Sequence, residues 1–200
     1  MIRGLWLVVF LLAGCSGTMM GGYQAYLAKK GVTDAVTIEK FPHCHGYGCR
    51  HVVNVKLSKR DWRAIEKPLR SIHSAAEERE GIKRSIAEFE KRVGDLTGTE
   101  QDRGGTYVDV GTMQHDCVDE SVNTTIYLAL LTQKKRLKFH EVGTPTARTI
   151  FTSGALGPHQ TAVIAETKTG ARFAVDSWFH DNGVMPEIVP LNEWIGGWRP

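Results

Sequence analysis

The chain has 200 residues, and its 25 basic and 22 acidic side chains give a formal net charge of +3 at pH 7. This nearly even balance of charge argues against a protein that binds nucleic acid. The length is sufficient for one domain with its own hydrophobic core, and no internal repeat or low-complexity tract suggests another organisation.

The first residues are typical of an export signal. Arg3 supplies a positive charge, and residues 5–13 form an apolar run that is too short to span a bilayer. The run ends in LAGC at residues 12–15, which resembles the bacterial lipobox, in which the Cys is lipidated and becomes the new N-terminus. We therefore expect Cys15 to carry lipid. An ordinary signal peptide that leaves this Cys unmodified is the alternative.

The residue after Cys15 indicates where such a protein is held. In lipoproteins of this type, a residue other than Asp at that position usually indicates the outer membrane, and Ser16 stands there. Several acyl chains together give stable attachment. We expect residues 1–14 to be a signal peptide and residues 15–34 a lipidated N-terminus and tether. Residues 35–200 would form a single domain on the periplasmic side of the cell envelope, anchored in the outer membrane.

The segment HCHGYGC, residues 43–49, predicts a cross-linked turn between two strands. Residues 35–41 and 52–57 are short β-rich runs on either side of it. Its two glycines allow the chain to reverse sharply, and an exported protein occupies an oxidising compartment. We therefore expect a disulfide between Cys44 and Cys49.

Two helices are expected in the N-terminal part of this domain, residues 35–105. Ser58 can cap a helix that a proline interrupts. Ser74 and Glu77 form a capping box for a second helix, whose apolar residues repeat at helical spacing until Gly94 ends the pattern. The other face of this helix is rich in Glu, Lys and Arg, which predicts packing on one side only.

The remaining residues, 106–200, predict a core in which a buried helix packs on an antiparallel sheet. Asp116 is a suitable N-cap, and apolar residues on most of the circumference follow it, which predicts a largely buried helix that begins at Cys117. Residues 161–167 and 171–178 are β-rich and predict a hairpin. Together these elements indicate an α+β fold.

Cys117 is the cysteine left over when Cys15 is lipidated and the pair at positions 44 and 49 is bonded. A leftover thiol in an exported protein is a candidate nucleophile. It lies in the first turn of its helix, where free backbone N–H groups and the helix dipole stabilise a thiolate relative to a thiol. Asp119 and Glu120 oppose this effect by charge repulsion. The alternative is a buried, unreactive Cys.

The predicted hairpin also brings a His and an Asp to one face of the sheet. If its connection holds an even number of residues, Thr161 lies opposite Asp176, and His159 lies on the same side as Thr161. His159 and Asp176 then become diagonal neighbours, close enough for the carboxylate to orient the imidazole. An odd-length connection without a bulge would place them on opposite faces.

The order Cys117, His159, Asp176 resembles that of the transglutaminase-like branch of the papain-type thiol enzymes, and most closely the bacterial transglutaminase-like cysteine proteinases. DCVD at residues 116–119 is similar to the Asp-Cys-any-Asp motif of that bacterial group. HQTAVIAETKTGARFAVDSWF at residues 159–179 is similar to the family's second block, a His strand, a turn and a strand that ends in Asp and an aromatic residue.

The resemblance, which covers residues 112–178, implies a papain- or transglutaminase-like core with a catalytic triad. Cys117 would attack an amide carbonyl, His159 would act as base and then as acid, and Asp176 would orient His159. The backbone N–H of Cys117 and the side chain of Gln114 are candidate oxyanion donors. Papain-type enzymes place their Gln further from the Cys, so Gln114 departs from the pattern.

These roles imply a periplasmic thiol amidase, peptidase or acyltransferase that acts on peptide amides through an acyl-thioester. Its partners would be a peptide or protein substrate of the envelope, with peptidoglycan among the candidates, and the membrane through the N-terminal lipid, but no nucleic acid. One alternative is a non-catalytic envelope binding or structural lipoprotein of the same fold.

The other alternative is a metal-binding lipoprotein that uses the His and Cys side chains of residues 43–51. The spacing of this cluster departs from both the haem attachment pattern and the paired-cysteine zinc patterns. We therefore expect a disulfide with exposed histidines there, no metal ion and no cofactor.

Overall fold

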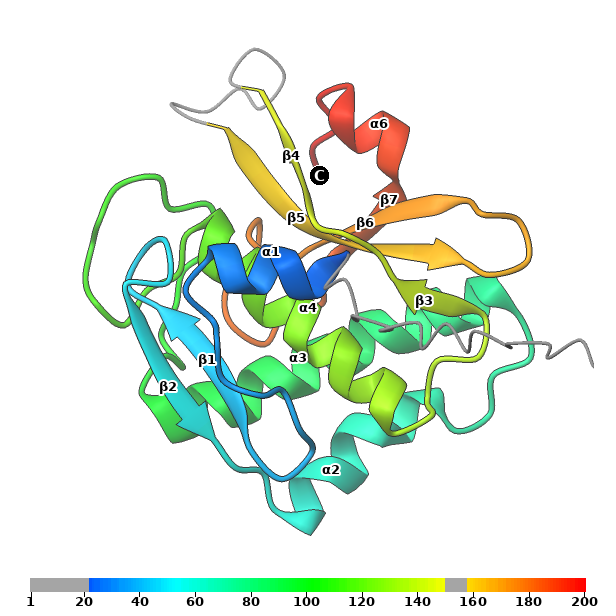
Figure 1. Ribbon diagram of the computed structural model, residues 1–200, viewed down its shortest axis with the longest axis horizontal. Helices are drawn as coiled ribbons and strands as arrows, with labels where there is room; N and C mark the ends of the chain where they lie inside the picture. Colours follow the sequence, from blue (N-terminus) through cyan, green and yellow to red (C-terminus); the bar gives the residue numbers. More distant parts are fainter. Residues whose placement is uncertain (1–21, 150–157) are drawn as a thin grey trace, which may run out of the picture.

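The computed structural model describes residues 22–149 and 158–200, which form an α+β fold (Figure 1). The expected signal peptide, residues 1–14, and the expected lipidation site Cys15 lie outside the described residues. Within the described residues, every helix is too short or too polar to cross a bilayer. The helices are α1 (Tyr23–Lys29), α2 (Lys59–Glu66), the 3-10 turn η1 (Lys67–Leu69), α3 (Ala75–Thr97), α4 (Cys117–Gln133) and α6 (Leu191–Ile195).

All strand pairing in the described residues is antiparallel. The hairpin β1–β2 forms one sheet, and a larger sheet has the order β3-β5-β6-β7. The first half of β5 pairs with β4, whereas its second half pairs with β3 on the same edge. The strands are β1 (Phe41–His45), β2 (His51–Val55), β3 (His140–Val142), β4 (Thr146–Arg148), β5 (His159–Glu166), β6 (Arg172–Asp176) and β7 (Glu187–Pro190).

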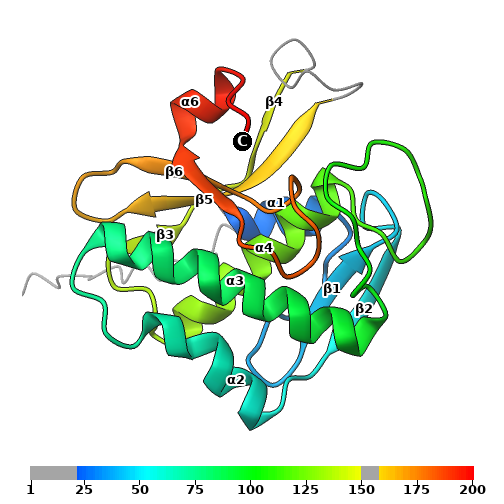
Figure 2. The ribbon, with the colours of Figure 1, turned by 180° about the vertical axis from the view of Figure 1, so that it is seen from behind.

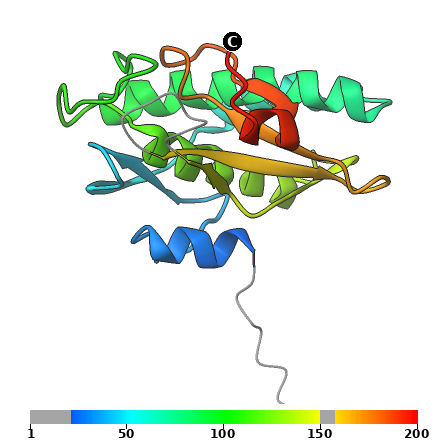
Figure 3. The ribbon, with the colours of Figure 1, turned by 90° about the horizontal axis from the view of Figure 1, so that it is seen from above.

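Helix α4 is the central element of the fold, as predicted. Every side chain from Asp119 to Leu131 is buried, because α4 packs between the β1–β2 hairpin and strand β5 (Figure 1). Figures 2 and 3 show α3 and α1 on opposite sides of the layer that contains α4 and the larger sheet. The helix that begins at Cys117 is therefore enclosed by strands and helices along most of its length.

The register of the β5–β6 hairpin is the predicted one. Ala162 lies opposite Val175, and continuation of this register by one position brings Thr161 opposite Asp176. His159, two residues before Thr161, therefore shares a face of the sheet with Asp176. This prediction is confirmed.

The first strand begins later than the sequence predicts. Strand β1 starts at Phe41, whereas the sequence analysis places a strand over residues 35–41. The backbone N–H of Thr37 donates a hydrogen bond to the carbonyl of Lys40, which closes a turn immediately before the strand. The β-rich composition of this segment instead serves packing, since Val36 contacts the core without belonging to a strand.

Residues 23–29, expected to belong to the tether, form helix α1. Leu27 is buried against the core. The hydroxyl of Tyr26 lies 3.1 Å from Oγ of Ser121 and 2.9 Å from Oε1 of Gln160, and it can donate to either. These contacts join α1 to the helix that carries Cys117 and to the strand that carries His159.

Helices α2 and α3 begin at the predicted caps, Ser58 and Ser74, each of which accepts a backbone N–H bond in the first turn. Helix α3 continues for a further turn beyond Gly94 and ends at Gly98, whose φ of 82° is the left-handed conformation of a helix C-cap. A Cβ on Gly94 would lie 3.0 Å from Cα of Glu100. Gly94 therefore allows the backbone at Glu100 to approach α3 closely, and it does not end the helix.

Candidate active site

Cys117 occupies the first position of α4. The carboxylate of Asp116 accepts hydrogen bonds of 2.9 Å from the backbone N–H groups of Val118 and Asp119. Asp119 in turn accepts the N–H of Asp116 at 3.1 Å, which completes a capping box. The cap fixes where the helix begins and holds the side chain of Cys117, a partly buried residue, at its N-terminal end.

His159 and Asp176 form a buried pair. Nε2 of His159 lies 2.6 Å from Oδ2 of Asp176, and the two side chains are 2% and 1% exposed. The same oxygen accepts a hydrogen bond of 2.7 Å from the indole N–H of Trp194. Because the carboxylate accepts, we assign the proton to Nε2, which leaves Nδ1 as the basic nitrogen. Nδ1 is buried and has no hydrogen-bond partner among the described residues.

Three aromatic side chains surround the imidazole of His159. The ring centroids of Trp178, Phe179 and Trp194 lie 4.7, 5.3 and 5.4 Å from that of the imidazole. Apolar rings at these distances exclude water, and a hydrogen bond is electrostatically stronger where the local dielectric is low. The aromatic rings therefore strengthen the interaction between His159 and Asp176.

Cys117 and His159 line the same cleft, whose volume is about 220 Å³. The sulfur of Cys117 lies 3.8 Å from the carbonyl oxygen of Pro158, the residue before His159. Since both side chains face this cleft, a group that enters it can contact both. The cleft is lined by Tyr47, Thr106, Tyr107, Asp116, Cys117, Pro158, His159 and Trp178.

The thiol of Cys117 is less acidic than the sequence analysis predicts. Burial raises its pKa to about 12, and the carboxylates of Asp116 and Asp176 add to the increase, whereas backbone hydrogen bonds of Gln160 and Cys117 lower it. Desolvation and two negative charges thus raise the thiol pKa by more than the N-terminus of the helix lowers it. The resting side chain is a thiol and not a thiolate.

Replacing Asp116 with asparagine is expected to accelerate alkylation of Cys117 by iodoacetamide. Asn keeps the N-cap but removes a negative charge that raises the thiol pKa, so a larger fraction of the sulfur is ionised at mildly alkaline pH. We expect an increase of up to about tenfold, the effect of one pKa unit. Quantitative mass spectrometry of the Cys117 peptide measures the rate.

The control for this experiment is Asp109→Asn, an exposed carboxylate that pairs with Arg50. Its alkylation rate should equal that of the unmodified chain. In the unmodified chain the rate should also keep rising as the pH increases beyond 9, since the folded thiol ionises at higher pH than a free thiol. Equal rates in Asp116→Asn and the unmodified chain would contradict this account of the pKa.

The side chain of Gln114 is not brought into the cleft. Its Oε1 accepts the backbone N–H of Arg103 at 3.0 Å, and its Nε2 donates to the carbonyl of Gln101 at 2.9 Å. It lines a separate hollow with these two residues. Gln114 therefore does not have the position expected of an oxyanion donor, because both ends of its amide connect the segment after α3 to the segment before α4.

The disulfide loop forms one wall of the cleft. The sulfurs of Cys44 and Cys49 lie at disulfide distance, as predicted. All four residues from 46 to 49 have positive φ. The backbone N–H groups of Tyr47 and Cys49 donate hydrogen bonds of 2.8 and 2.7 Å to the carboxylate of Asp119. Asp119 thereby connects α4 to the loop that contributes Tyr47 to the cleft.

A second set of polar contacts joins α4 to the strand that carries Asp176. The hydroxyl of Ser177 lies 2.9 Å from a carboxylate oxygen of Glu120, to which it donates, and 2.8 Å from the hydroxyl of Thr124. Ser177 directly follows Asp176, so these bonds hold the end of β6 against the first two turns of α4. Sequence reasoning missed them, and the one signal was the excess of polar side chains on a helix predicted to be buried.

Sequence reasoning also missed Trp194, which lies in α6 and is fully buried. The indole N–H of Trp194 donates to Asp176, and its backbone carbonyl accepts a hydrogen bond of 2.7 Å from the guanidinium of Arg148. The same guanidinium lies 4.6 Å from the centre of the indole ring. A buried Trp generally requires a partner for its N–H. The sequence does not identify Asp176 as that partner, because Trp194 is distant from Asp176, and from Arg148, along the chain.

Replacing Trp194 with phenylalanine is expected to destabilise the fold by about 1.5–3 kcal/mol, the range for a hydrogen bond to a charged group. Phenylalanine keeps most of the ring contact with His159 but leaves Asp176 with one donor fewer. Urea denaturation measures the change. Trp198→Phe is the control, since the Trp198 side chain makes no hydrogen bond to Asp176, and a loss of equal size there would contradict the assignment.

The His and Cys side chains of residues 43–51 do not form a set of free ligands. Cys44 and Cys49 are bonded to each other. Nδ1 of His45 lies 2.7 Å from a backbone carbonyl, and Nδ1 of His43 lies 3.3 Å from the hydroxyl of Tyr127. Both histidines are buried, whereas the sequence analysis expects them to be exposed. The two histidines are buried because both faces of strand β1 are covered by other parts of the chain.

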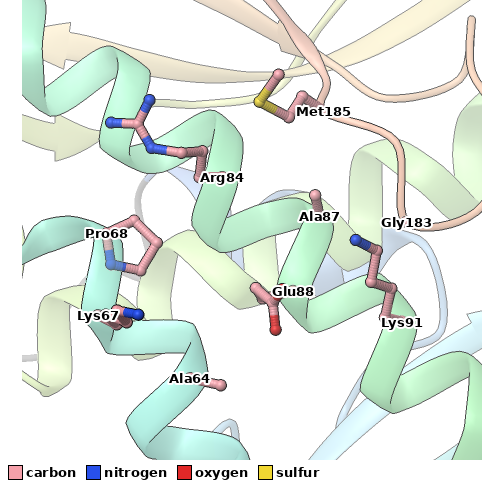
Figure 4. Close-up of a pocket in the computed structure, with 9 residues that line it drawn as sticks. All are labelled: Ala64, Lys67, Pro68, Arg84, Ala87, Glu88, Lys91, Gly183 and Met185. Carbon is pink, nitrogen blue, oxygen red and sulfur yellow. The ribbon is translucent and has the colours of Figure 1, made fainter.

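A larger cavity of about 610 Å³ lies away from these residues (Figure 4). Helix α3 crosses it, with the end of α2 and η1 on one side and the segment of residues 183–185 on the other. Its charged residues are Lys67, Arg84, Glu88 and Lys91. The cavity has neither a thiol nor an imidazole in its lining, so the smaller cleft is the better candidate for nucleophilic chemistry.

Comparisons with known proteins do not identify this chain. No protein-family model matches it, and neither a curated protein nor a solved structure shows significant similarity. The candidate site is therefore defined by its own geometry.

Proposed function

We propose that this chain is a thiol amidase, peptidase or acyltransferase that forms an acyl-thioester on Cys117. One observation carries the proposal: Cys117 and His159 line a common cleft, and one ring nitrogen of His159, Nε2, is hydrogen-bonded to buried Asp176. A nucleophile, a base and a group that orients the base are the components of a catalytic triad. Because the order Cys, His, Asp is also that of the papain- and transglutaminase-like enzymes, we propose that residues 106–200 form a core of that type.

In the proposed reaction, the proton moves together with the attack. The thiol of Cys117 gives its proton to Nδ1 of His159 as the C–S bond to the amide carbonyl forms. The imidazolium then gives this proton to the amine nitrogen as the C–N bond breaks, which leaves an acyl-thioester. Water or a second amine attacks the thioester, His159 takes its proton, and the sulfur recovers that proton as it leaves.

The residues around the pair support these steps. The raised thiol pKa means that Cys117 needs a base during the attack, and the free Nδ1 can accept the proton. The Asp176 carboxylate stabilises the imidazolium that forms next to it. The backbone N–H of Cys117, at the start of α4, is the proposed oxyanion donor, because the first N–H groups of a helix have no partner within it.

The proposed substrate is a peptide or protein amide of the cell envelope, with peptidoglycan stem peptides among the candidates. This part of the proposal rests on the N-terminal sequence. A lipid on Cys15 would hold the domain on the periplasmic side of the outer membrane. An open cleft lined by Tyr47, Tyr107 and Trp178 suits an extended peptide, since aromatic rings provide contact area at low entropic cost.

A peptidyl chloromethyl ketone tests the proposal. The reagent should alkylate Cys117 faster in the native chain than in the chain unfolded in urea, although the native thiol is less acidic, because the cleft binds the peptide and His159 assists. Iodoacetamide, which has no peptide portion, should show the opposite order. Equal labelling of native and unfolded chains by the peptidyl reagent would contradict an active site at Cys117.

A non-catalytic envelope lipoprotein of the same fold is the second candidate. The observation that favours it is the protonated thiol, whose sulfur contacts a backbone carbonyl, while Nδ1 of His159 has no hydrogen-bond partner in the part of the chain that the structure describes. In that case the chain would bind peptides in the cleft without turnover, and Cys117→Ala would bind them with unchanged affinity.

A further inference from the structure

A cluster of buried ionisable side chains lies on the interior side of the first turn of α4. Nδ1 of His115 lies 3.1 Å from Oδ2 of Asp102 and 3.0 Å from Oε1 of Glu120. The three residues are 3%, 4% and 9% exposed, and their three potential ligand atoms lie within 4.8 Å of one another. Asp102 lies in the loop after α3, His115 lies in the segment before α4, and Glu120 lies in α4 itself.

The hydrogen bonding of this cluster is incomplete. Two carboxylate oxygens lie near Nδ1 of His115 and compete for a single ring N–H, and Nε2 of His115 has no hydrogen-bond partner among the described residues. Glu90 on α3 is 7% exposed and interacts electrostatically with Glu120, His115 and Asp102. Its Oε2 accepts the N–H of Gly183, but its Oε1 is buried and has no partner within residues 22–149 and 158–200.

A second buried His–Glu pair in the same chain shows what complete pairing looks like. Glu78 accepts Nδ1 of His140 at 2.9 Å and two backbone N–H groups at 2.6 and 2.9 Å, and Nη1 of Arg79 lies 3.4 Å from the other ring nitrogen. In the cluster around His115, by contrast, three carboxyl groups share one imidazole. Among the described residues no Lys or Arg forms an ion pair with them, so His115 alone must compensate the charge of the buried carboxyl groups.

We propose that Asp102, His115 and Glu120 bind a divalent transition-metal ion, with Zn²⁺ as the ion that fits best. Zinc accepts imidazole nitrogen and carboxylate oxygen at about 2.0–2.2 Å, which places neighbouring ligand atoms about 3.0–3.5 Å apart. The two separations from Nδ1, 3.1 Å to Asp102 and 3.0 Å to Glu120, fall in that range. Calcium and magnesium fit less well, because they prefer oxygen ligands alone. The ion would thus have three protein ligands, as catalytic zinc sites do.

Such an ion would join the three segments that support the cleft. His115 lies two residues before Cys117, and the second carboxylate oxygen of Glu120 holds Ser177, next to Asp176. Bound metal would therefore fix the start of α4 relative to α3 and to the end of β6. The inference does not depend on catalysis, because a chain that only binds peptides would hold the ion in the same way.

The full-length chain, purified without chelators and dialysed against Zn²⁺, should contain about one zinc ion per chain by elemental analysis. Asp102→Asn and Glu120→Gln keep the shapes of the side chains but weaken the ligands. Each should reduce zinc affinity by more than about tenfold, the loss that even an outer-shell partner causes. Glu78→Gln, in the complete pair, is the matched control and should keep the ion.

Cobalt provides a measurement that needs no variant. Co²⁺ bound by the cluster should give the visible absorption of a low-coordinate ion with nitrogen and oxygen ligands, and Zn²⁺ should displace it. Less than stoichiometric zinc after dialysis, or a cobalt spectrum no different from that of the free ion, would overturn the proposal. So would equal zinc affinity in Asp102→Asn and the unmodified chain. None of these measurements uses the activity of Cys117, so their failure leaves the proposed function unaffected.

Discussion

Replacing Cys117 with alanine is expected to abolish acylation of the chain by a p-nitrophenyl ester and to reduce amide turnover by at least about 10⁴-fold. The sulfur forms the covalent bond in the proposed reaction, and no other described side chain shares the cleft with His159 and could replace it as a thiol. The unmodified chain should release a burst of p-nitrophenolate equal to the chain concentration. Intact-mass spectrometry should place the acyl group on Cys117.

Cys117→Ser is the matched control for this experiment. It replaces the thiol with a hydroxyl of similar shape at the first position of α4, where the Asp116 cap is unchanged, so circular dichroism and thermal unfolding should match the unmodified chain. A burst that persists in Cys117→Ala, with the acyl group on surface lysines, would show that the ester reacts nonspecifically and would contradict the role of the sulfur.

Replacing Asp176 with asparagine has the second largest expected effect, a loss of about 10²–10⁴-fold in the rate of acylation. The amide oxygen of Asn can still accept the bonds from Nε2 of His159 and from Trp194, so the fold should remain intact. The variant lacks the negative charge that stabilises the imidazolium, and its NH₂ group can favour the wrong tautomer of His159. Stopped-flow acylation kinetics measure the change.

Asp181→Asn is the control for Asp176→Asn. Asp181 is close in sequence and accepts a backbone N–H from Gly104, but it is outside the cleft. Its substitution should leave the acylation rate within about twofold, as expected for a residue that makes no contact with the reacting groups. Equal rates in Asp176→Asn and the unmodified chain would contradict a role for the buried His–Asp pair.

Local rules were sufficient to predict much of the scaffold. The cap of α4, the disulfide loop and the register of the β5–β6 hairpin each depend on a few neighbouring residues, and each is present as predicted. The hairpin register mattered most, because an even-length connection places His159 and Asp176 on one face and an odd-length one separates them, and the structure has the even register. Hairpin geometry is short-range, so the sequence reduces the register to these two possibilities.

The electrostatic state of Cys117 could not be predicted from the sequence. The helix terminus is a local feature and favours a thiolate, but burial of the sulfur and the approach of Asp176 come from tertiary packing. The same limit applies to Gln114, whose amide is occupied by two backbone groups of a loop. Trp194 is the clearest case, since a residue of the C-terminal segment supplies the second hydrogen bond to Asp176.

The polar side chains in the first two turns of α4 explain how the site is held together. Asp119 connects the helix to the disulfide loop, Glu120 and Thr124 connect it to Ser177, and Ser121 contacts Tyr26 on α1. In a buried helix each of these groups requires a partner, because an unsatisfied polar group in the interior is costly. The partners belong to the segments that form the cleft, so the requirement for hydrogen bonds also fixes the position of Cys117.

A crystal structure of the chain with a bound peptide aldehyde would test the central claim most directly. We predict a covalent bond between the aldehyde carbon and the sulfur of Cys117, with Nδ1 of His159 within about 3.5 Å of the sulfur or the new hydroxyl, and Nε2 still bonded to Asp176. An aldehyde held in the cleft but not bonded to the sulfur, with the imidazole turned away from it, would contradict the proposed thiol chemistry.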